Sequence, residues 1–510
     1  MTRPPKFAVA FGDQFDEDVC RSTVYHQIGG RFMKPAIISL HDYRSFIKQK
    51  LRSAEIHIAA CPDSLYRIYK VFLNLDLADV DRIMQTKYSL CGPPPRQPSA
   101  MLRSMLLMVL LHVTRFTVWV DMMRTTPIYA IISGFDPFYV PGASTFYDFM
   151  YRMWDGTSKD LSPHVKPMPV KVKKPKGQGK KAESIEPESV DNLILRLMGQ
   201  RFGLDTEAYA TLFRIFKSCF LDVSVSKGLV TPEQIETAGD GTPVVTAARF
   251  RHHRTCDCAE KGIPNCTCDR YFSQSDTNVG WDSSRGMFYV GYDMYVLTEA
   301  RSELPLFCHL NYASKHDSHG FCEAFFRFLA LFPELKPSSL LLDSAHDSMA
   351  IYRLCQGLHI TPYIDLNLCN TKKTSDYHGV VLGPDGIPIC SAGLKMKTNG
   401  NDLHRQYAKF RCPMMKKGGC TCPCPCTNAT FGRTCSIPMK TNIRLYTDPP
   451  RESQEWKSMY NRRTASERVN KRMKGDFLLE HVRHRHTCFW YARVYLIMMA
   501  VHLSSWSLYS

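Results

Sequence analysis

Hydrophobic residues in the middle of the chain fall into short apolar runs separated by amphipathic stretches. Short apolar or alternating runs are typical of β-strands, whereas apolar residues at three- and four-residue spacing are typical of helices. The resulting order, β-β-β-α-β-α-β, places this region in the α/β class. The pattern predicts strands at residues 234–246, 286–297, 304–313, 339–343 and 360–366, and helices at residues 320–332 and 348–358.

The hydrophobic pattern before residue 190 predicts a separate, all-α domain. Leucines and methionines recur at helical spacing over Ser99–Ala130, and a second amphipathic stretch covers Thr145–Trp154. We expect a helical N-terminal domain at residues 1–156. Residues 157–189 are rich in Lys and Pro and nearly lack large apolar side chains, so they predict a basic, flexible linker. Residues 190–510 then form the second domain, which contains the predicted sheet.

The net charge of the chain indicates the kind of partner that it binds. The 510 residues carry a net charge of +17, from 65 Lys and Arg against 48 Asp and Glu. Such a surplus favours a polyanionic partner, because each neutralised phosphate releases counterions, although a merely solubilising charge is the alternative. The N-terminal domain would then bind DNA, and the linker either contacts DNA phosphates or is a solvated tether.

Neither of the two most apolar stretches predicts a membrane span. Met101–Val113 contains Arg103, Phe489–Leu503 contains Arg493 and His502, and both fall short of about 20 clean apolar residues. We interpret both as buried helices. The chain also opens without the pattern of a secretory signal, so we expect a cytoplasmic protein associated with DNA.

Two aspartates lie at the ends of predicted strands. Asp343 ends the most apolar strand, and side chains at the carboxyl ends of strands in open α/β sheets face the functional crevice. An ionised carboxylate there needs compensation, which a metal ion supplies, whereas a helix-cap or turn aspartate is the alternative. Asp240 lies in the segment GDGT at the end of the first strand, where a simple turn residue is the alternative.

A third carboxylate lies on a predicted helix, Tyr460–Lys474. At 100° per residue, Tyr460, Arg463, Glu467 and Lys474 fall within a stripe about 60° wide. One face would thus present an aromatic ring, two cations that can hold phosphates and a carboxylate that can bind metal. The alternative is an exposed helix with an Arg463–Glu467 ion pair.

The spacing Y-x2-R-x3-E-x6-K resembles the signature of transposases related to the one encoded by insertion sequence four. The segments IETAGDGTPV and LLLDSAHDSMAIYRLCQGLHITPYIDLN resemble the strands that carry the first and second Asp of that family. The likeness covers most of residues 90–505, including the helical N-terminal region. It implies an RNase H-like catalytic core in which Asp240, Asp343 and Glu467 are catalytic. The family usually has an aromatic residue three positions after the second Asp, where this chain has His346.

The resemblance also implies partners and cofactors. The three carboxylates would bind two Mg²⁺ or Mn²⁺ ions, which suit a site made of oxygen ligands. Tyr460, Arg463 and Lys474 would grip DNA near the cut. The protein would bind the terminal inverted repeats of an insertion sequence as a homodimer, cleave them and transfer them to target DNA.

Cysteines form two clusters that the family resemblance does not explain. Cys256, Cys258, Cys266 and Cys268 lie within 13 residues, in an insertion at about 250–272. Four such thiolates suit tetrahedral Zn²⁺, although the C-x-C spacing is unusual and surface thiols are the alternative. A mainly β insertion at about 372–447 carries the second candidate zinc set: Cys412, Cys420, Cys422, Cys424, Cys426 and Cys435.

Three rival functions remain open at this point. A domesticated transposase would bind DNA without cutting it, but it would have no need to keep three carboxylates. A zinc-dependent DNA-binding regulator would explain the charge and the cysteines, and it would need zinc rather than Mg²⁺ or Mn²⁺. A nuclease on the same core that does not transpose would differ only in forming no joined products.

Overall fold

The computed structural model describes most of the chain as two compact units. The first unit holds the described residues before Met108 together with Val120–Gly142, and the second holds Met108–Trp119 and the described residues from Ala143 onward. The predicted linker lies mostly outside the described residues, since positions 162–187 are not among them. The described residues are 34–90, 95–161, 188–248, 253–254, 256–263, 270–271, 273–274, 276–368, 374–416, 419–422 and 427–506.

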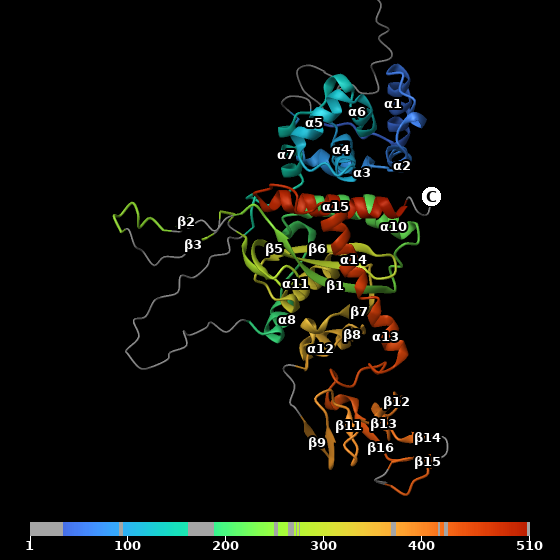
Figure 1. Cartoon of the computed structure of the whole chain (residues 1–510). Helices are drawn as coiled ribbons and strands as arrows, with labels where there is room; N and C mark the ends of the chain where they lie inside the picture. The colour runs from blue at the N-terminus through green and yellow to red at the C-terminus, as the bar shows by residue number, and fades with distance from the viewer. Residues whose placement is uncertain are drawn as a thin grey trace, which may run out of the picture. The chain divides into compact units, whose positions relative to one another are not determined.

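The first unit is helical, as predicted. Its helices include α1 (Leu40–Ser53), α2 (Asp63–Phe72), α3 (Ala78–Met84), α4 (Pro98–Leu110), α5 (Phe116–Thr125) and α6 (Pro127–Ser133), of which α4 and α5 extend into the second unit (Figure 1). The predicted helical region Ser99–Ala130 is therefore three helices. The first break contains His112, whose φ of 57° is left-handed, and the second precedes Pro127, which suits the first turn of a helix.

A mixed sheet forms the centre of the second unit. Its order is β4-β5-β1-β7-β8, and β6 pairs with β5. β1 pairs with β5 in antiparallel and with β7 in parallel orientation, and this arrangement agrees with the predicted RNase H-like core. The strands are β1 (Ile235–Val245), β4 (Asn278–Asp282), β5 (Met287–Glu299), β6 (Leu304–Tyr312), β7 (Pro337–Leu342) and β8 (Thr361–Ile364). All five predicted strands are confirmed.

Helices cover both faces of this sheet. α11 (Asp317–Leu331) packs on the face that includes Tyr295. α14 (Thr464–Lys471) and α15 (Thr487–Trp506) pack on the other face, where Asn470 contacts Asp240 and Thr487 contacts Tyr292. The remaining helices of this unit are α7 (Ala143–Arg152), α8 (Val190–Met198), α9 (Ala210–Phe216), α10 (Asp222–Ser226), α12 (Met349–Gly357) and α13 (Gln454–Asn461).

The apolar helix α15 is buried within the second unit, as its sequence suggested. Arg493 is 4% exposed and donates to the Phe477 carbonyl at 2.7 Å, and His502 contacts the Ser224 hydroxyl at 2.8 Å. These partners allow polar groups to lie inside a helix that is otherwise apolar. In the described part of the chain, no helix combines the length and hydropathy that a bilayer crossing requires.

The helical unit ends earlier than the predicted domain boundary at 156. α7 belongs to the second unit, where Tyr147 contacts Phe489 of α15 edge-on. The start of the predicted linker is also ordered, because the Asp160 carboxylate accepts from the Thr487 amide at 3.0 Å. Ser189, at the predicted end of the linker, caps α8 through the Asn192 amide. Asp160 and Ser189, both inside the predicted linker, thus form hydrogen bonds with α15 and α8, so the predicted linker is too long at both ends.

The segment between β8 and α13 forms small sheets with a core of their own. Phe410, Ile437 and Tyr446 are buried in this core, against which Cys435 packs. The predicted β character of the insertion is therefore observed in its described residues. Its strands are β9 (Ser375–Tyr377), β10 (Val380–Leu382), β11 (Pro388–Ile389), β12 (Lys397–Asp402), β13 (Tyr407–Arg411), β14 (Met415–Lys416), β15 (Gly419–Cys420) and β16 (Thr434–Pro438), and the earlier insertion holds β2 (His253–Arg254) and β3 (Arg270–Tyr271).

We expect Gly291→Ala to destabilise the second unit. A Cβ at this position would lie 1.9 Å from the Val244 carbonyl oxygen, so β1 and β5 would have to separate locally. Overpacking of this kind costs about 1–3 kcal/mol or more. Thermal unfolding followed by circular dichroism should show the loss, whereas Gly203→Ala, where a Cβ meets nothing within 4 Å, should not. Equal melting temperatures for both variants would contradict the observed pairing.

Candidate active site

Parallel pairing of β1 with β7 brings the two predicted aspartates together. The register aligns Ala238 with Leu341, so Asp240 and Asp343 follow at equivalent positions two residues further along. Side chains two residues apart in a strand point to the same face. Ala238 and Leu341 pack under Trp456 and Ala465 of helices α13 and α14, which therefore cover the same face as the aspartates. Asp240 and Asp343 are thus neighbours in the structure, and their binding of metal stays a prediction.

The two carboxylates differ in their electrostatic surroundings. Burial, together with the charge of Asp343, raises the pKa of Asp240 to about 7. Burial acts on Asp343 in the same direction, but the hydrogen bond from His346 holds its pKa below the ordinary value. The negative charge at this edge of the sheet is therefore incompletely compensated at Asp240.

A buried chain of hydrogen bonds fixes Asp343. His346 is 1% exposed, and its Nδ1 lies 2.6 Å from Asp343 Oδ1. Since a carboxylate accepts, Nδ1 carries the proton, and in a neutral ring Nε2 then accepts from the Tyr295 hydroxyl at 2.8 Å. His346, the residue that departs from the family pattern, thus orients the second aspartate.

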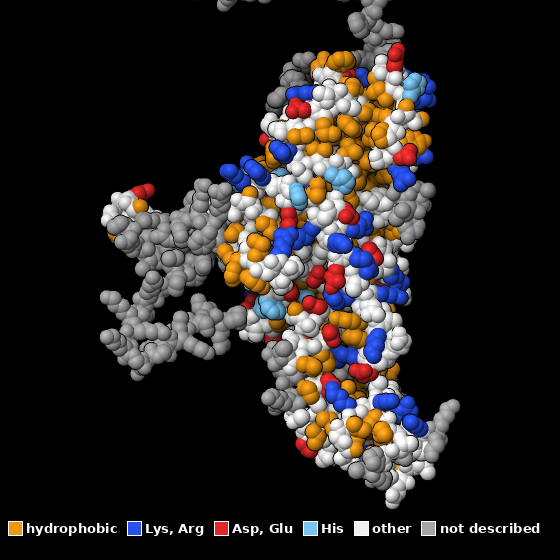
Figure 2. Space-filling model, viewed as in Figure 1, with side chains coloured by type: hydrophobic (Ala, Val, Ile, Leu, Met, Phe, Trp, Pro, Cys, Tyr) orange, Lys and Arg blue, Asp and Glu red, His pale blue; other side chains and the backbone are white. Residues whose placement is uncertain are grey.

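The predicted helix Tyr460–Lys474 is not one continuous helix. It divides into α13, α14 and a wide π-helical turn, η9 (Arg472–Asp476), with a break near Arg463. Three of the four stripe residues still lie together, since Arg463 stacks over the Tyr460 ring at 5.7 Å and pairs with Glu467 at 2.7 Å. Figure 2 shows acidic and basic side chains intermixed on the face where α14 lies.

Glu467 contacts a cation, as the ion-pair alternative predicted. Its side chain is 51% exposed, whereas that of its partner Arg463 is 17% exposed. Arg463 also acts electrostatically on Asp240 and Asp343, so it links the glutamate to the aspartate pair. Glu467 is therefore linked to the aspartate pair through Arg463, which engages its carboxylate.

Lys474 lies apart from the other stripe residues. Its ammonium group donates to the Pro243 carbonyl at 2.6 Å and to the Thr242 hydroxyl at 3.3 Å, and it lies 3.4 Å from Glu480. Because the π-helical turn departs from 3.6 residues per turn, the predicted helical spacing does not extend to this residue. Lys474 holds the end of α14 against β1.

Asn470 is a site residue that the sequence reasoning missed. Its side-chain amide donates to Asp240 Oδ2 at 3.0 Å, and its own Oδ1 is buried with no hydrogen-bond partner among the described atoms. The signal was present, because Asn470 lies one turn after Glu467 and about 60° from it around the helix. As an uncharged amide, however, Asn470 carries no charge that would mark it in the sequence.

A second acidic pair lies beneath the first, on the α11 face. Burial, together with neighbouring carboxylates, raises the pKa values of Asp293 and Asp317. Gly241 leaves room for both, because a Cβ there would lie 2.8 Å from Asp317 Oδ1 and 3.2 Å from Asp293 Oδ1. Asp293 interrupts the apolar strand β5, and an isolated charge in such a strand is the signal that could have found it.

The oxygen donors of this region suit a hard divalent cation. Asp240 and Asp343 provide adjacent carboxylates whose repulsion a cation would relieve, and the unpartnered Oδ1 of Asn470 is a further oxygen. Within the described residues, no three His, Cys, Asp or Glu side chains are already gathered to hold a metal ion. Glu467 forms an ion pair with Arg463 and therefore does not join Asp240 and Asp343 in a three-carboxylate ligand set in this structure.

The predicted zinc sets are described only in part. Cys266, Cys268, Cys424 and Cys426 lie outside the described residues. Cys412 follows β13, Cys420 lies in β15 and Cys435 lies in β16 against a small apolar core. Packing against this core thus gives Cys435 a role that needs no metal. Around the remaining predicted ligands, Cys256, Cys258 and Cys422, the described residues form no group of three or more His, Cys, Asp or Glu side chains that could hold a metal ion.

We expect Asp240→Asn to stabilise the metal-free protein above neutral pH. The pKa of Asp240 is about 7 in the folded protein, against an ordinary 3.8, so the folded state holds a proton that the unfolded state has released. Its contribution to stability therefore falls as pH rises from about 4 to 7, by up to roughly 1.4 kcal/mol per pH unit. Thermal melts in EDTA between about pH 4 and 8 should show that the melting temperature of the variant rises relative to that of the wild type as pH increases.

Asp402→Asn is the matched control for that experiment. A hydrogen bond from Lys409 lowers the pKa of Asp402, so removing its charge should bring no gain in stability above pH 7. If Asp240→Asn also brings no gain there, the raised pKa of Asp240 is wrong.

Comparison with known proteins agrees with this geometry. Residues 240–503, more than half of the chain, match the family described as the transposase DDE domain. The match starts at Asp240 and includes Asp343 and Glu467. No curated protein matches the chain. The chain therefore belongs to the transposase DDE domain family.

Proposed function

We propose that this protein is an insertion-sequence transposase that cleaves the terminal inverted repeats of its element and joins them to target DNA. The observation that carries the proposal is the parallel register of β1 and β7, which brings Asp240 and Asp343 to adjacent positions beneath the helix that bears Glu467. Membership of the transposase DDE domain family supports the same reaction class. In this proposal the three carboxylates are the catalytic residues.

The aspartates and Glu467 would hold two Mg²⁺ or Mn²⁺ ions. When bound, these ions activate water or a 3′-hydroxyl and stabilise the leaving oxygen in phosphoryl transfer. Asn470 orients Asp240, and His346 orients Asp343, so both carboxylates are fixed before substrate arrives. Fixed ligands reduce the reorganisation that binding requires.

Arg463 is the cation best placed to contact a DNA phosphate near the cut. It stacks on Tyr460, which in turn stacks on Trp456 with ring centroids 4.7 Å apart. Stacking holds the guanidinium in one plane, which favours bidentate contact with a phosphate. The exchange of Glu467 for phosphate on Arg463 would free the glutamate for metal binding. Lys474 serves this site indirectly, by fixing the end of α14.

The proposal also covers DNA contacts outside the active site, dimerisation and zinc binding. The helical N-terminal domain and the basic linker would contact the element's ends, two copies of the chain would pair them, and the net charge of +17 favours both end and target DNA. The two cysteine clusters would bind structural zinc, for which their dense spacing is the support.

We expect Glu467→Gln to abolish cleavage while DNA binding remains. Loss of a metal ligand removes several kcal/mol of transition-state stabilisation, so cleavage should fall by roughly a hundredfold or more. The measurement is cleavage of a labelled duplex carrying the element's own end, with Mg²⁺ or Mn²⁺, beside a binding assay. Glu455→Gln, an exposed glutamate on α13, is the control and should cut as the wild type does.

The outcomes separate the alternatives. Equal cleavage by wild type and Glu467→Gln would show that Glu467 has been wrongly assigned. Binding without cleavage by the wild type, with either metal, would exclude an active transposase. Cleavage without joined products would identify a nuclease that does not transpose.

We expect His346→Phe to weaken metal activation without unfolding the protein. Phenylalanine keeps an aromatic ring of similar size but cannot donate to Asp343 or accept from Tyr295. Loss of such an orienting partner raises the metal concentration for half-maximal cleavage roughly 10- to 100-fold. Titration of cleavage with Mn²⁺ measures this shift, whereas fewer active molecules would lower only the maximum. An unchanged half-saturation point would contradict the orienting role.

A further inference from the structure

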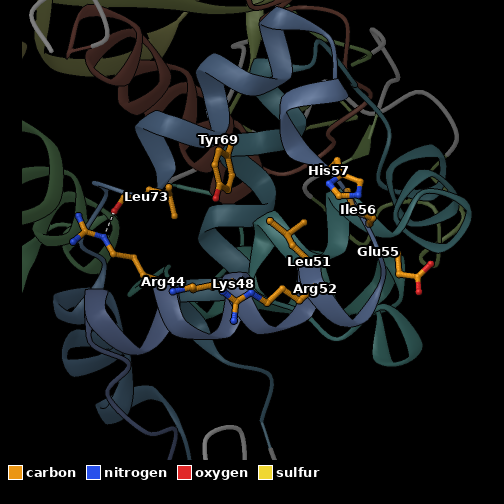
Figure 3. Close-up of a pocket in the computed structure, with 9 residues that line it drawn as sticks. All are labelled: Arg44, Lys48, Leu51, Arg52, Glu55, Ile56, His57, Tyr69 and Leu73. Atoms are coloured by element: carbon orange, nitrogen blue, oxygen red, sulfur yellow. Dashed lines mark hydrogen bonds between the residues drawn. The ribbon is translucent and has the colours of Figure 1, made fainter.

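A basic groove lies in the N-terminal unit, between α1 and the chain that follows it. Its volume is about 710 Å³, and the lining includes Arg44, Lys48 and Arg52 from α1 and Tyr69 from α2. Figure 3 shows the three cationic side chains along one helix, with Tyr69 on the facing wall. All of these residues belong to the first compact unit, so the groove does not depend on the second.

The three cations form one row. They recur at every fourth residue of α1, a spacing that keeps side chains on neighbouring positions of one helix face. Successive members are about 6 Å apart along the helix axis, so the row extends over about 12 Å. Leu51 lies buried beside the row and anchors this part of α1 to the core.

Among the described residues, no carboxylate forms an ion pair with this row. Arg44 donates to the Leu73 carbonyl at 2.6 Å and to Asn74 Oδ1 at 2.8 Å, both of which are neutral acceptors. Among the ion pairs of the described residues, none includes Lys48 or Arg52. Lys50 on the same helix is different, because it pairs with Asp136 at 2.6 Å.

Arg44 is fixed in place by its hydrogen bonds. A guanidinium held by two neutral acceptors keeps its full charge and retains N–H groups for a further acceptor. Preorganisation of this kind lowers the entropy cost of binding an anion. Glu55, the one carboxylate in the lining, lies past the end of α1, after the third cation of the row.

We propose that this groove binds consecutive backbone phosphates of duplex DNA. A row of about 12 Å exceeds the size of a single phosphate and suits a polymer with repeated charges. Phosphate contacts fix the register of a protein on the duplex and do not read the base sequence. The inference rests on the proposed function, and it assigns to α1 the positioning of transposon-end DNA on the N-terminal unit.

The salt dependence of binding tests the proposal. Each phosphate contact contributes about 0.9 to the slope of log affinity against log salt. For the full chain and a labelled duplex, we expect Lys48→Ala with Arg52→Ala to reduce this slope by about 1.8, and to weaken binding at low salt. Lys48→Arg with Arg52→Lys keeps both charges and should preserve the slope.

Lys50→Ala is the matched control, because it removes the same charge from the same helix. Its ammonium already pairs with Asp136, so the slope should stay that of the wild type. Melting curves of each variant verify folding. Should the double variant keep the wild-type slope and affinity, the groove is not a phosphate site and the proposed function stands. If the wild-type chain shows no DNA binding, both the phosphate-binding role of the groove and the proposed function are wrong.

Discussion

The parallel pairing of β1 with β7 is the constraint on which the active-site region depends. It places Asp240 and Asp343 at equivalent positions of adjacent strands, so two carboxylates lie side by side in a partly buried environment. Their repulsion, added to burial, raises the pKa of Asp240 to about 7. Two close, partly buried negative charges are unfavourable for folding, so the fold must place hydrogen-bond donors beside them.

Positioned donors compensate each aspartate, and they come from opposite faces of the sheet. Asn470 of α14 donates to Asp240, and His346, backed by Tyr295 on the α11 face, donates to Asp343. The apolar side of α14 meanwhile buries Ala465 and Val469 against the strands. Hydrophobic packing thus determines where α14 lies, and its polar residues act on the site only because that packing holds them there.

The sequence predicted most of the sheet, because strands depend on local pattern, and the same pattern placed Asp240 and Asp343 at strand ends. Apolar runs of strand length predicted five of the six strands of the central sheet, but not β4, and Asp240 and Asp343 lie near the ends of two of these runs. The segment with Glu467 was correctly predicted to be helical, but it is divided into α13, α14 and η9 and is not one continuous helix. A pattern of 100° per residue cannot show the break near Arg463 or the π-helical turn from which Lys474 donates to Pro243 of β1.

Tertiary pairing also explains why other site residues were not predicted. Asn470 and His346 have no charge pattern of their own, and each becomes relevant only when the fold brings it to a carboxylate. The same holds for cations that are close in sequence. Lys50 pairs with Asp136, far along the chain, whereas no ion pair among the described residues includes Lys48. Sequence gives the total charge of the protein, whereas the structure decides which charges remain available to a phosphate. The surplus of +17 is therefore informative about DNA only through the subset that folding leaves unneutralised.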